Sequence, residues 1–138
     1  MFNVKIKQTV DNMDKFQTAC ESLINKSVLI GIDDPYLAPA AYNLEYGDPY
    51  ENIPPQPFLI PAVEAYLNDD VKILGQAITE IMNVQSSNNP TLVINYALDQ
   101  IGENSAENVR YHFDKVVCKN DSEHEAIERA INYKVEDD

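Results

Sequence analysis

The sequence predicts an α+β fold in which a small, mainly antiparallel sheet, formed by the N-terminal half, packs against helices. Short apolar runs of strand type occur early in the chain, and long segments with apolar residues at three- and four-residue spacing follow them. A chain of 138 residues has the length of one domain. We therefore expect residues 1–138 to form a single domain, with an extended proline-rich arm at about 48–60 and an acidic C-terminal tail at about 119–138.

The first 35 residues supply the expected strands. Residues 2–7 alternate apolar and polar side chains, which is the period of a half-buried strand. From residue 10 to residue 24 the apolar positions change to helical spacing, so a helix is expected there. The continuous apolar run at 28–32 predicts a buried strand that ends in the turn Asp33-Asp34-Pro35.

The middle of the chain combines a short helix with the arm. Residues 39–46 are helix-prone, and Gly47 is placed to end that helix in a left-handed conformation. Residues 48–57 contain four prolines, which have no N–H group to donate to a sheet, so an extended arm is expected. Pro61 then fits the first turn of a helix over 61–83.

The second half is expected to be mostly helical. Asn89-Pro90 is a strong start signal for a helix over 90–117. Because its apolar stripe and that of 61–83 both need burial, the two helices predict a long antiparallel hairpin. Ser122-x-x-Glu125 indicates a last short helix, and residues 131–135 leave the choice between helix and strand open.

The charge of the chain narrows the classes of partner. Ten basic and 23 acidic residues leave a net charge of −13. That balance argues against binding a nucleic-acid backbone and against an anionic membrane surface, since both are bound through Lys and Arg. It is compatible with a basic partner, or with a surface past which DNA must slide. No apolar stretch reaches the length of a membrane span, and Cys20 and Cys118 are expected to be buried and reduced in a cytoplasm.

No pattern of chemically active residues stands out, so we expect neither an enzyme nor a cofactor. His112 and His124 do not have the spacing of metal ligands. Asp69 and Asp70 are neighbours on a helix and point about 100° apart, so they do not converge on one substrate atom. The sequence therefore predicts no catalytic, cofactor-binding or metal-binding residue.

Aromatic residues around the arm leave two interpretations open. Four tyrosines cluster there, at positions 36, 42, 46 and 50. Their rings either pack on a neighbouring subunit or cover the edge of this subunit's own sheet. Phe58 presents the same choice, because an apolar side chain at the end of the arm can close the core of its own subunit or contact the next one.

The arm and the helix before it resemble a known family. The segments are Leu44-Glu45-Tyr46-Gly47 and Ile53-Pro54-Pro55-Gln56-Pro57-Phe58-Leu59-Ile60-Pro61-Ala62. They are similar to the tail-completion (neck) proteins of lambda-like siphophages and to the Mu-type virion morphogenesis proteins, which show Glu-Phe-Gly followed by Ile-Pro-x-Arg-Pro-Phe-Leu-x-Pro-Ala. Weaker matches at 97–102 and 108–110 extend the resemblance over about 28–110. Gln56 replaces the family's usual Arg, and Asp48 its usual Thr.

The resemblance implies a structural protein of a tailed-bacteriophage virion, made in the host bacterial cytoplasm. It would be a head-tail connector component that joins the portal-connector to the tail, as a homo-oligomeric ring that we expect to be a hexamer. Its partners would be further copies of itself, the portal or connector, and tail-tube or terminator proteins, with DNA passing through the channel without specific binding. The residues expected in the arm interface are Tyr46, Gly47, Tyr50, Ile53, Pro54, Pro57, Phe58, Leu59 and Pro61.

Two other classes of function remain open. A compact acidic protein can mimic DNA and inhibit a DNA-binding enzyme, and such an inhibitor should act as a monomer or dimer. A tail-assembly chaperone would be absent from finished particles, whereas a neck protein would be present in them.

Overall fold

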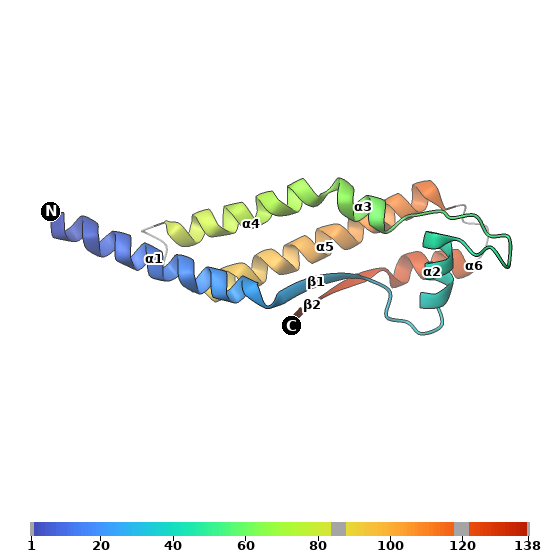
Figure 1. The fold of residues 1–138 in the computed structure, drawn as a ribbon, viewed down its shortest axis with the longest axis horizontal. Helices are drawn as coiled ribbons and strands as arrows, with labels where there is room; N and C mark the ends of the chain where they lie inside the picture. The colour runs from blue at the N-terminus through green and yellow to red at the C-terminus, as the bar shows by residue number, and fades with distance from the viewer. Residues whose placement is uncertain (1, 84–87, 118–121, 138) are drawn as a thin grey trace. The chain divides into compact units, whose positions relative to one another are not determined.

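The structure is a computed structural model that describes residues 2–83, 88–117 and 122–137, with side chains from Met13 onward. The elements along the chain are α1 (Phe2–Ile24), β1 (Lys26–Gly31), α2 (Ala38–Tyr46), α3 (Ile60–Ala65), α4 (Leu67–Met82), α5 (Pro90–Val116), α6 (Ser122–Ala130) and β2 (Asn132–Asp137). Helices combined with a two-stranded antiparallel sheet confirm the predicted α+β class (Figure 1).

The chain divides into two compact units, each assembled from separate stretches of sequence. The first unit comprises Met1–Val28, Asp69–Ile101 and Val135–Asp138, and the second comprises Leu29–Asn68 and Gly102–Lys134. Helix α5 contributes to both units, and each unit has its own cluster of buried apolar side chains. The expectation of a single domain over 1–138 stays a prediction.

In the first unit, α4 and the beginning of α5 form the predicted antiparallel hairpin (Figure 1). Their apolar stripes meet in a cluster that also includes Ala19 of α1. The buried members are Ala19, Ala77, Ile81, Ile94, Ala97 and Leu98. Burial of both stripes explains why two helices that would be marginal alone are stable together.

Helix α5 begins where the sequence predicts. The side-chain Oδ1 of Asn89 accepts the N–H of Thr91 at 2.9 Å, so Asn89 is a true N-cap before Pro90. The Thr91 hydroxyl also lies 3.1 Å from the hydroxyl of Ser22, which links α1 to α5. The predicted turn at 85–89 lies largely outside the described residues.

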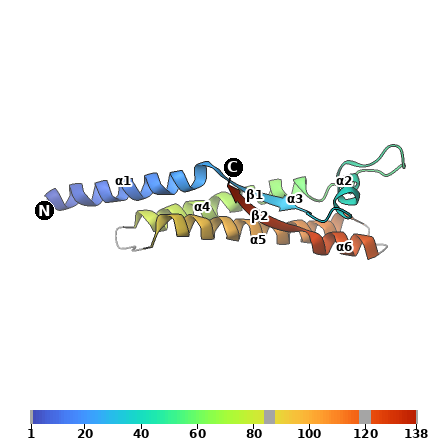
Figure 2. The same ribbon diagram turned by 90° about the horizontal axis from the view of Figure 1, so that it is seen from below.

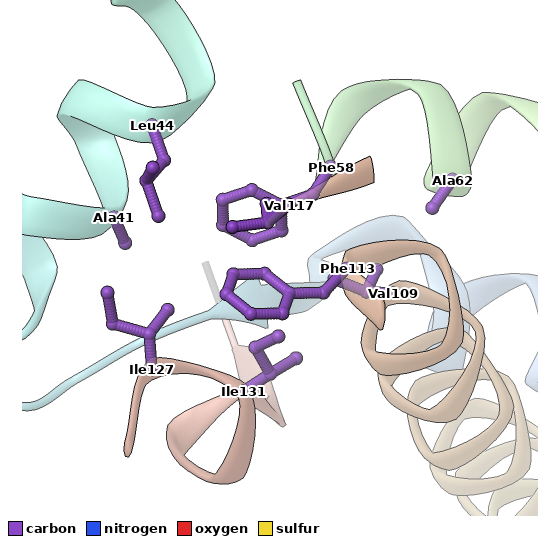
Figure 3. Packing of buried hydrophobic residues seen from close by; sticks show 9 residues of the cluster. All are labelled: Ala41, Leu44, Phe58, Ala62, Val109, Phe113, Val117, Ile127 and Ile131. Atoms are coloured by element: carbon purple, nitrogen blue, oxygen red, sulfur yellow. The ribbon is translucent and has the colours of Figure 1, made fainter. Parts of the chain in front are cut away.

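The second unit has a core centred on two phenylalanine rings (Figure 3). Its buried residues are Ala41, Leu44, Phe58, Ala62, Val109, Phe113, Val117, Ile127 and Ile131. Ile127 lies in α6 and Ile131 directly follows it, and both are completely buried. The short helix predicted from Ser122 is confirmed as α6, and the choice left open at 131–135 is decided in favour of the strand β2.

The sheet pairs β1 with β2, which lie side by side in both views (Figures 1 and 2). Lys26 Nζ lies 3.1 Å from Asp137 Oδ1, and Lys134 Nζ lies 3.9 Å from Asp33 Oδ1. One ion pair therefore lies near each end of the two-stranded sheet. The expected sheet from the N-terminal half alone is wrong, since its second strand comes from the C-terminus.

Residues 2–7 are also helical and not a strand, because α1 begins at Phe2. Helical hydrogen bonds join residues four apart, so the helix over 10–24 can continue backward through residues 2–7. A strand would instead need a second strand beside it to pair with. Within the described residues the sheet has two strands, and β1 pairs with β2. The period-two pattern at 2–7 therefore misled the prediction.

The helix expected at 61–83 is interrupted once. Helix α3 ends at Ala65 and α4 begins at Leu67, with Tyr66 between them at φ −107° and ψ 9°. Asp69 and Asp70 fill the first turn of α4, where negative charge is favoured by the helix dipole. The two carboxylates thus mark the start of a new helix, which the apolar spacing alone did not reveal.

Gly102 in α5 allows a close approach by the ring of Tyr133 in β2. A Cβ at Gly102 would lie 2.6 Å from Tyr133 Cγ and 2.7 Å from its Cε2. Overpacking in Gly102→Ala should therefore lower the free energy of unfolding by about 1–3 kcal/mol. The higher helix propensity of alanine should offset roughly 1 kcal/mol of that loss. Urea denaturation followed by circular dichroism measures this change.

Gly75→Ala is the matched control, because a Cβ at this α4 position meets nothing within 4 Å. It should raise the free energy of unfolding by about 0.5–1 kcal/mol through helix propensity alone. If the two alanine variants changed stability equally, the packing of Tyr133 on Gly102 would not be the reason for the glycine.

The remaining general expectations concern cysteines and membranes. Cys20 in α1 is half-buried and has a free thiol, and Cys118 lies outside the described residues. None of the helices in the described ranges has both the length and the apolar character needed to cross a bilayer.

Candidate interaction site

Helix α2 begins at a turn held by the side chain of Asp34. Asp34 Oδ1 accepts the N–H groups of Tyr36 at 2.8 Å and of Leu37 at 3.3 Å. Such a turn directs the chain from the strand into a helix, and Pro39 in the first turn suits the start of α2. The helix then buries Ala41, Leu44 and Glu45.

The arm starts with a closed turn that requires glycine. Gly47 has φ 76°, and a Cβ there would lie 2.9 Å from the Ile53 carbonyl oxygen and from Pro55 N. Asp48 and Ile53 exchange backbone hydrogen bonds of 2.8 and 2.9 Å, and Asp48 Oδ1 accepts the N–H of Tyr50 at 3.0 Å. Gly47 ends α2 with a positive φ as predicted, but its ψ of 169° lies outside the left-handed helical region that was expected. The tip of the arm is a hydrogen-bonded turn.

Glu45 is a buried acid, 6% exposed, that binds the far end of the arm. Its Oε2 accepts the N–H groups of Phe58 at 2.7 Å and Leu59 at 2.9 Å, and its Oε1 accepts the N–H of Ile60 at 3.0 Å. These donors precede or begin α3, where N–H groups lack partners within the helix. We call this set of bonds the Glu45 clamp.

The clamp replaces a local helix cap. Leu59, the N-cap residue of α3, makes no side-chain capping bond. The carboxylate of Glu45 supplies the missing acceptor from another helix, and its negative charge suits the positive end of the helix dipole. A second link lies beside it, because the Gln56 N–H donates to the Leu44 carbonyl oxygen at 2.7 Å. The arm is therefore attached to the last turn of α2 at two points.

Phe58 closes the core of its own subunit. Its side chain is 2% exposed, and its ring meets Phe113 of α5 edge-on, with centroids 5.0 Å apart and planes at 85° (Figure 3). Leu44 approaches the same pair of rings from α2 (Figure 3). Of the two interpretations that the sequence allowed for Phe58, the structure supports the one within a subunit.

The other residues expected in the arm interface differ in exposure. Tyr46, Tyr50, Pro54 and Pro57 are exposed, and Gly47, Ile53, Leu59 and Pro61 are half-buried. All four tyrosines around the arm are exposed, with Tyr36 at 89% and Tyr50 at 97%. The rings of Tyr42 and Tyr46 contact each other, with centroids 4.8 Å apart. The four rings therefore remain largely exposed to solvent and are not buried on the sheet.

Glu45 is the residue that the sequence prediction missed as a site residue. It belongs to the segment Leu44-Glu45-Tyr46-Gly47, of which the sequence predicts only Tyr46 and Gly47 in the arm interface. A usable signal was present, because Glu45 stands beside apolar Leu44 on a short helix with few charges. A buried acid needs hydrogen-bond donors. Because prolines have no N–H group, only a few residues of the arm could supply them, which narrows the search for the partners of Glu45.

The titratable residues weighed for a chemical role are distributed over α4, α5 and α6. Asp69 and Asp70 stand in the first turn of α4, and His112 is half-buried in α5. His124 in α6 is half-buried and lines an open pocket beside Gln56. No group of three or more His, Cys, Asp or Glu side chains in the described part of the chain can hold a metal ion.

Comparison of the chain with models of protein families, with curated proteins and with solved structures found no match. The interpretation of the arm therefore depends on its residues and their geometry.

Proposed function

We propose that this protein is a structural component of a tailed-bacteriophage virion, acting in tail completion at the neck between the portal-connector and the tail. The Glu45 clamp is the observation that carries the proposal. The two segments that resemble phage neck proteins are separated along the chain, and the clamp joins them into one hydrogen-bonded unit. If the two segments are shared with that family because they form the same structure, they should contact each other in the fold, as they do through the clamp.

The exposed tyrosines around the arm support assembly with other subunits. Tyr36, Tyr42, Tyr46 and Tyr50 are all exposed, and the backbone near them is held by the turn at Asp34, by Gly47 and by the clamp. Tyrosine on a rigid backbone loses little conformational entropy on binding and is common at interfaces. A ring, which we expect to be six-fold, needs two different patches on each subunit, and the arm is one candidate.

The acidic charge fits a channel through which DNA moves. A ring of six copies would carry about six times the −13 of one chain. Acids on the channel wall would repel the DNA backbone, so that it slides without specific binding, whereas a basic wall would retain it through counterion release.

Mass spectrometry of purified virions tests the proposal. We expect the chain to be present in finished particles at a copy number of about six, the value that a six-fold ring requires. Its absence from purified virions, with presence in infected cells, would contradict the neck proposal and favour a tail-assembly chaperone. A monomer that binds a host DNA-binding enzyme and is absent from particles would favour a DNA-mimic inhibitor.

A further inference from the structure

An open pocket of about 270 Å³ lies beside the arm in the second unit. It is lined mainly by apolar and aromatic residues from the end of β1, from α2 and from the arm. These include Ile32, Ala38, Tyr42, Tyr46, Phe58 and Leu59. Drug-sized ligands occupy pockets of roughly 300–1,000 Å³, so a space of this size suits one large side chain.

A second open pocket, of about 330 Å³, adjoins the first. Gly31 and Ile32 line both pockets, and the second also includes Asp33 and Asp34. We call the two pockets together the β1–α2 groove. One end of the groove is apolar, and the other end carries exposed carboxylates.

The acidic end keeps a net negative charge. Asp33 lies 3.9 Å from Lys134, which partly offsets one carboxylate. The carboxylate of Asp34 is oriented by the N–H groups of Tyr36 and Leu37 and remains exposed. Two acids and one lysine therefore face solvent at this end, in a chain that is itself strongly acidic.

We propose that the β1–α2 groove binds a segment of a different protein in which a large apolar residue is flanked by Lys or Arg. The apolar side chain would enter the pocket between Tyr42 and Leu59, and the flanking cation would lie beside Asp33 and Asp34. Burial of one apolar side chain supplies affinity, and charge complementarity supplies orientation and selectivity.

Charge distinguishes this occupant from the arm tip of a second copy of the chain. Among the side chains that the structure describes, the best exposed aromatic residue for insertion from another copy is Tyr50 at the arm tip, and it stands between Asp48 and Glu51. Inserting that tip would bring its acids toward Asp33 and Asp34, and like charges across an interface are unfavourable. A basic segment reverses the sign of this interaction.

The inference does not depend on the proposed function in the neck. If the protein is a neck component, the segment would belong to a portal or tail protein; the groove should bind its segment even if the chain is absent from virions. The peptide-binding test and the virion-composition test can therefore give independent outcomes, so failure of one proposal is distinguishable from failure of the other.

The test uses the full-length, ¹⁵N-labelled protein and a blocked peptide, Gly-Lys-Leu-Lys-Phe-Lys-Gly. Addition of the peptide should shift the backbone amide resonances of Ile32, Tyr42 and Leu59. A peptide with Glu in place of each Lys should bind at least about tenfold more weakly, since it exchanges attraction for repulsion. A peptide with Ser in place of Leu and Phe should lose measurable binding.

Two variants address the two ends of the groove. Tyr42→Ala should weaken peptide binding about tenfold, as expected for an aromatic contact at an interface. Asp33→Asn should weaken it about two- to fivefold, the range of an exposed ion pair, with the difference reduced at high salt. The matched controls Tyr96→Ala and Glu103→Gln lie on α5, line neither pocket and should bind like the unmodified chain.

Several results would overturn the inference. Equal binding of the Lys and Glu peptides would remove the charge argument, and resonance shifts confined to other surfaces would remove the groove. Shifts of the groove amides that depend on protein concentration without peptide would assign the surface to a second copy. No binding of the lysine peptide at about 1 mM, the weakest affinity of practical interest, would also reject the proposal.

Discussion

Glu45→Ala is expected to lower the free energy of unfolding by about 3–5 kcal/mol. The substitution leaves three N–H donors without their acceptor, and that of Phe58 is buried. A buried donor without a partner costs about 1–3 kcal/mol, and bonds to a charged acceptor are the stronger kind. Urea denaturation measures the global change. Hydrogen exchange of the amides of Phe58, Leu59 and Ile60 measures the local change, since their protection should fall with the clamp removed.

Two further substitutions separate the clamp from a simple change of charge. Glu64→Ala removes the same charge from an exposed position on α3 and should change stability by no more than about 0.5 kcal/mol. Glu45→Gln should give an intermediate loss, because the amide keeps one acceptor oxygen but turns N–H groups toward the other donors. Unchanged protection of the three amides in Glu45→Ala would show that the clamp does not hold the arm.

Phe58→Ala is expected to cost about 3–5 kcal/mol, as for a buried large-to-small substitution. The change removes the edge-on contact with Phe113 and leaves a cavity between α2, α3 and α5. Thermal unfolding should show a lower midpoint. If the chain acts at the phage neck, infected cells carrying this variant should accumulate filled heads and separate tails.

Tyr50→Ala provides the control that separates folding from assembly. Its ring is almost fully exposed at the arm tip, so its loss should leave the stability within about 0.5 kcal/mol. A reduced yield of joined particles from a stable Tyr50→Ala protein would locate an assembly contact at the tip. A Phe58→Ala protein of unchanged stability would contradict the core position of that ring.

Local signals determined the parts of the fold that the sequence predicted correctly. Asn89-Pro90 marked the start of α5, because an N-cap and the helix it begins lie within a few residues. Gly47 marked the end of α2, since the positive φ it adopts is a local backbone property. The run at 28–32 matched β1 closely, although its side chains are half-buried or exposed where a buried strand was expected.

The arm was predicted as irregular, but the role of each residue in it depended on contacts with other elements. Prolines excluded a regular strand from the sequence alone. Whether Phe58 faced its own core or a neighbour depended on Phe113, which lies 55 residues further along the chain. Glu45 was overlooked as a site residue because its partners lie 13 to 15 residues away, beyond any helical or turn spacing.

The sequence by itself determined the helix-rich composition, the positions of α2 and α5, the glycine turn and the strongly acidic surface. Each of these depends on backbone preference, capping or charge, which act within one turn of the chain. Only the tertiary structure decided that β2 from the C-terminus pairs with β1, that residues 2–7 continue a helix, and that Glu45 holds the arm. Strand pairing and the satisfaction of buried donors join residues distant in sequence, so they are settled by which partners the fold brings within hydrogen-bonding distance.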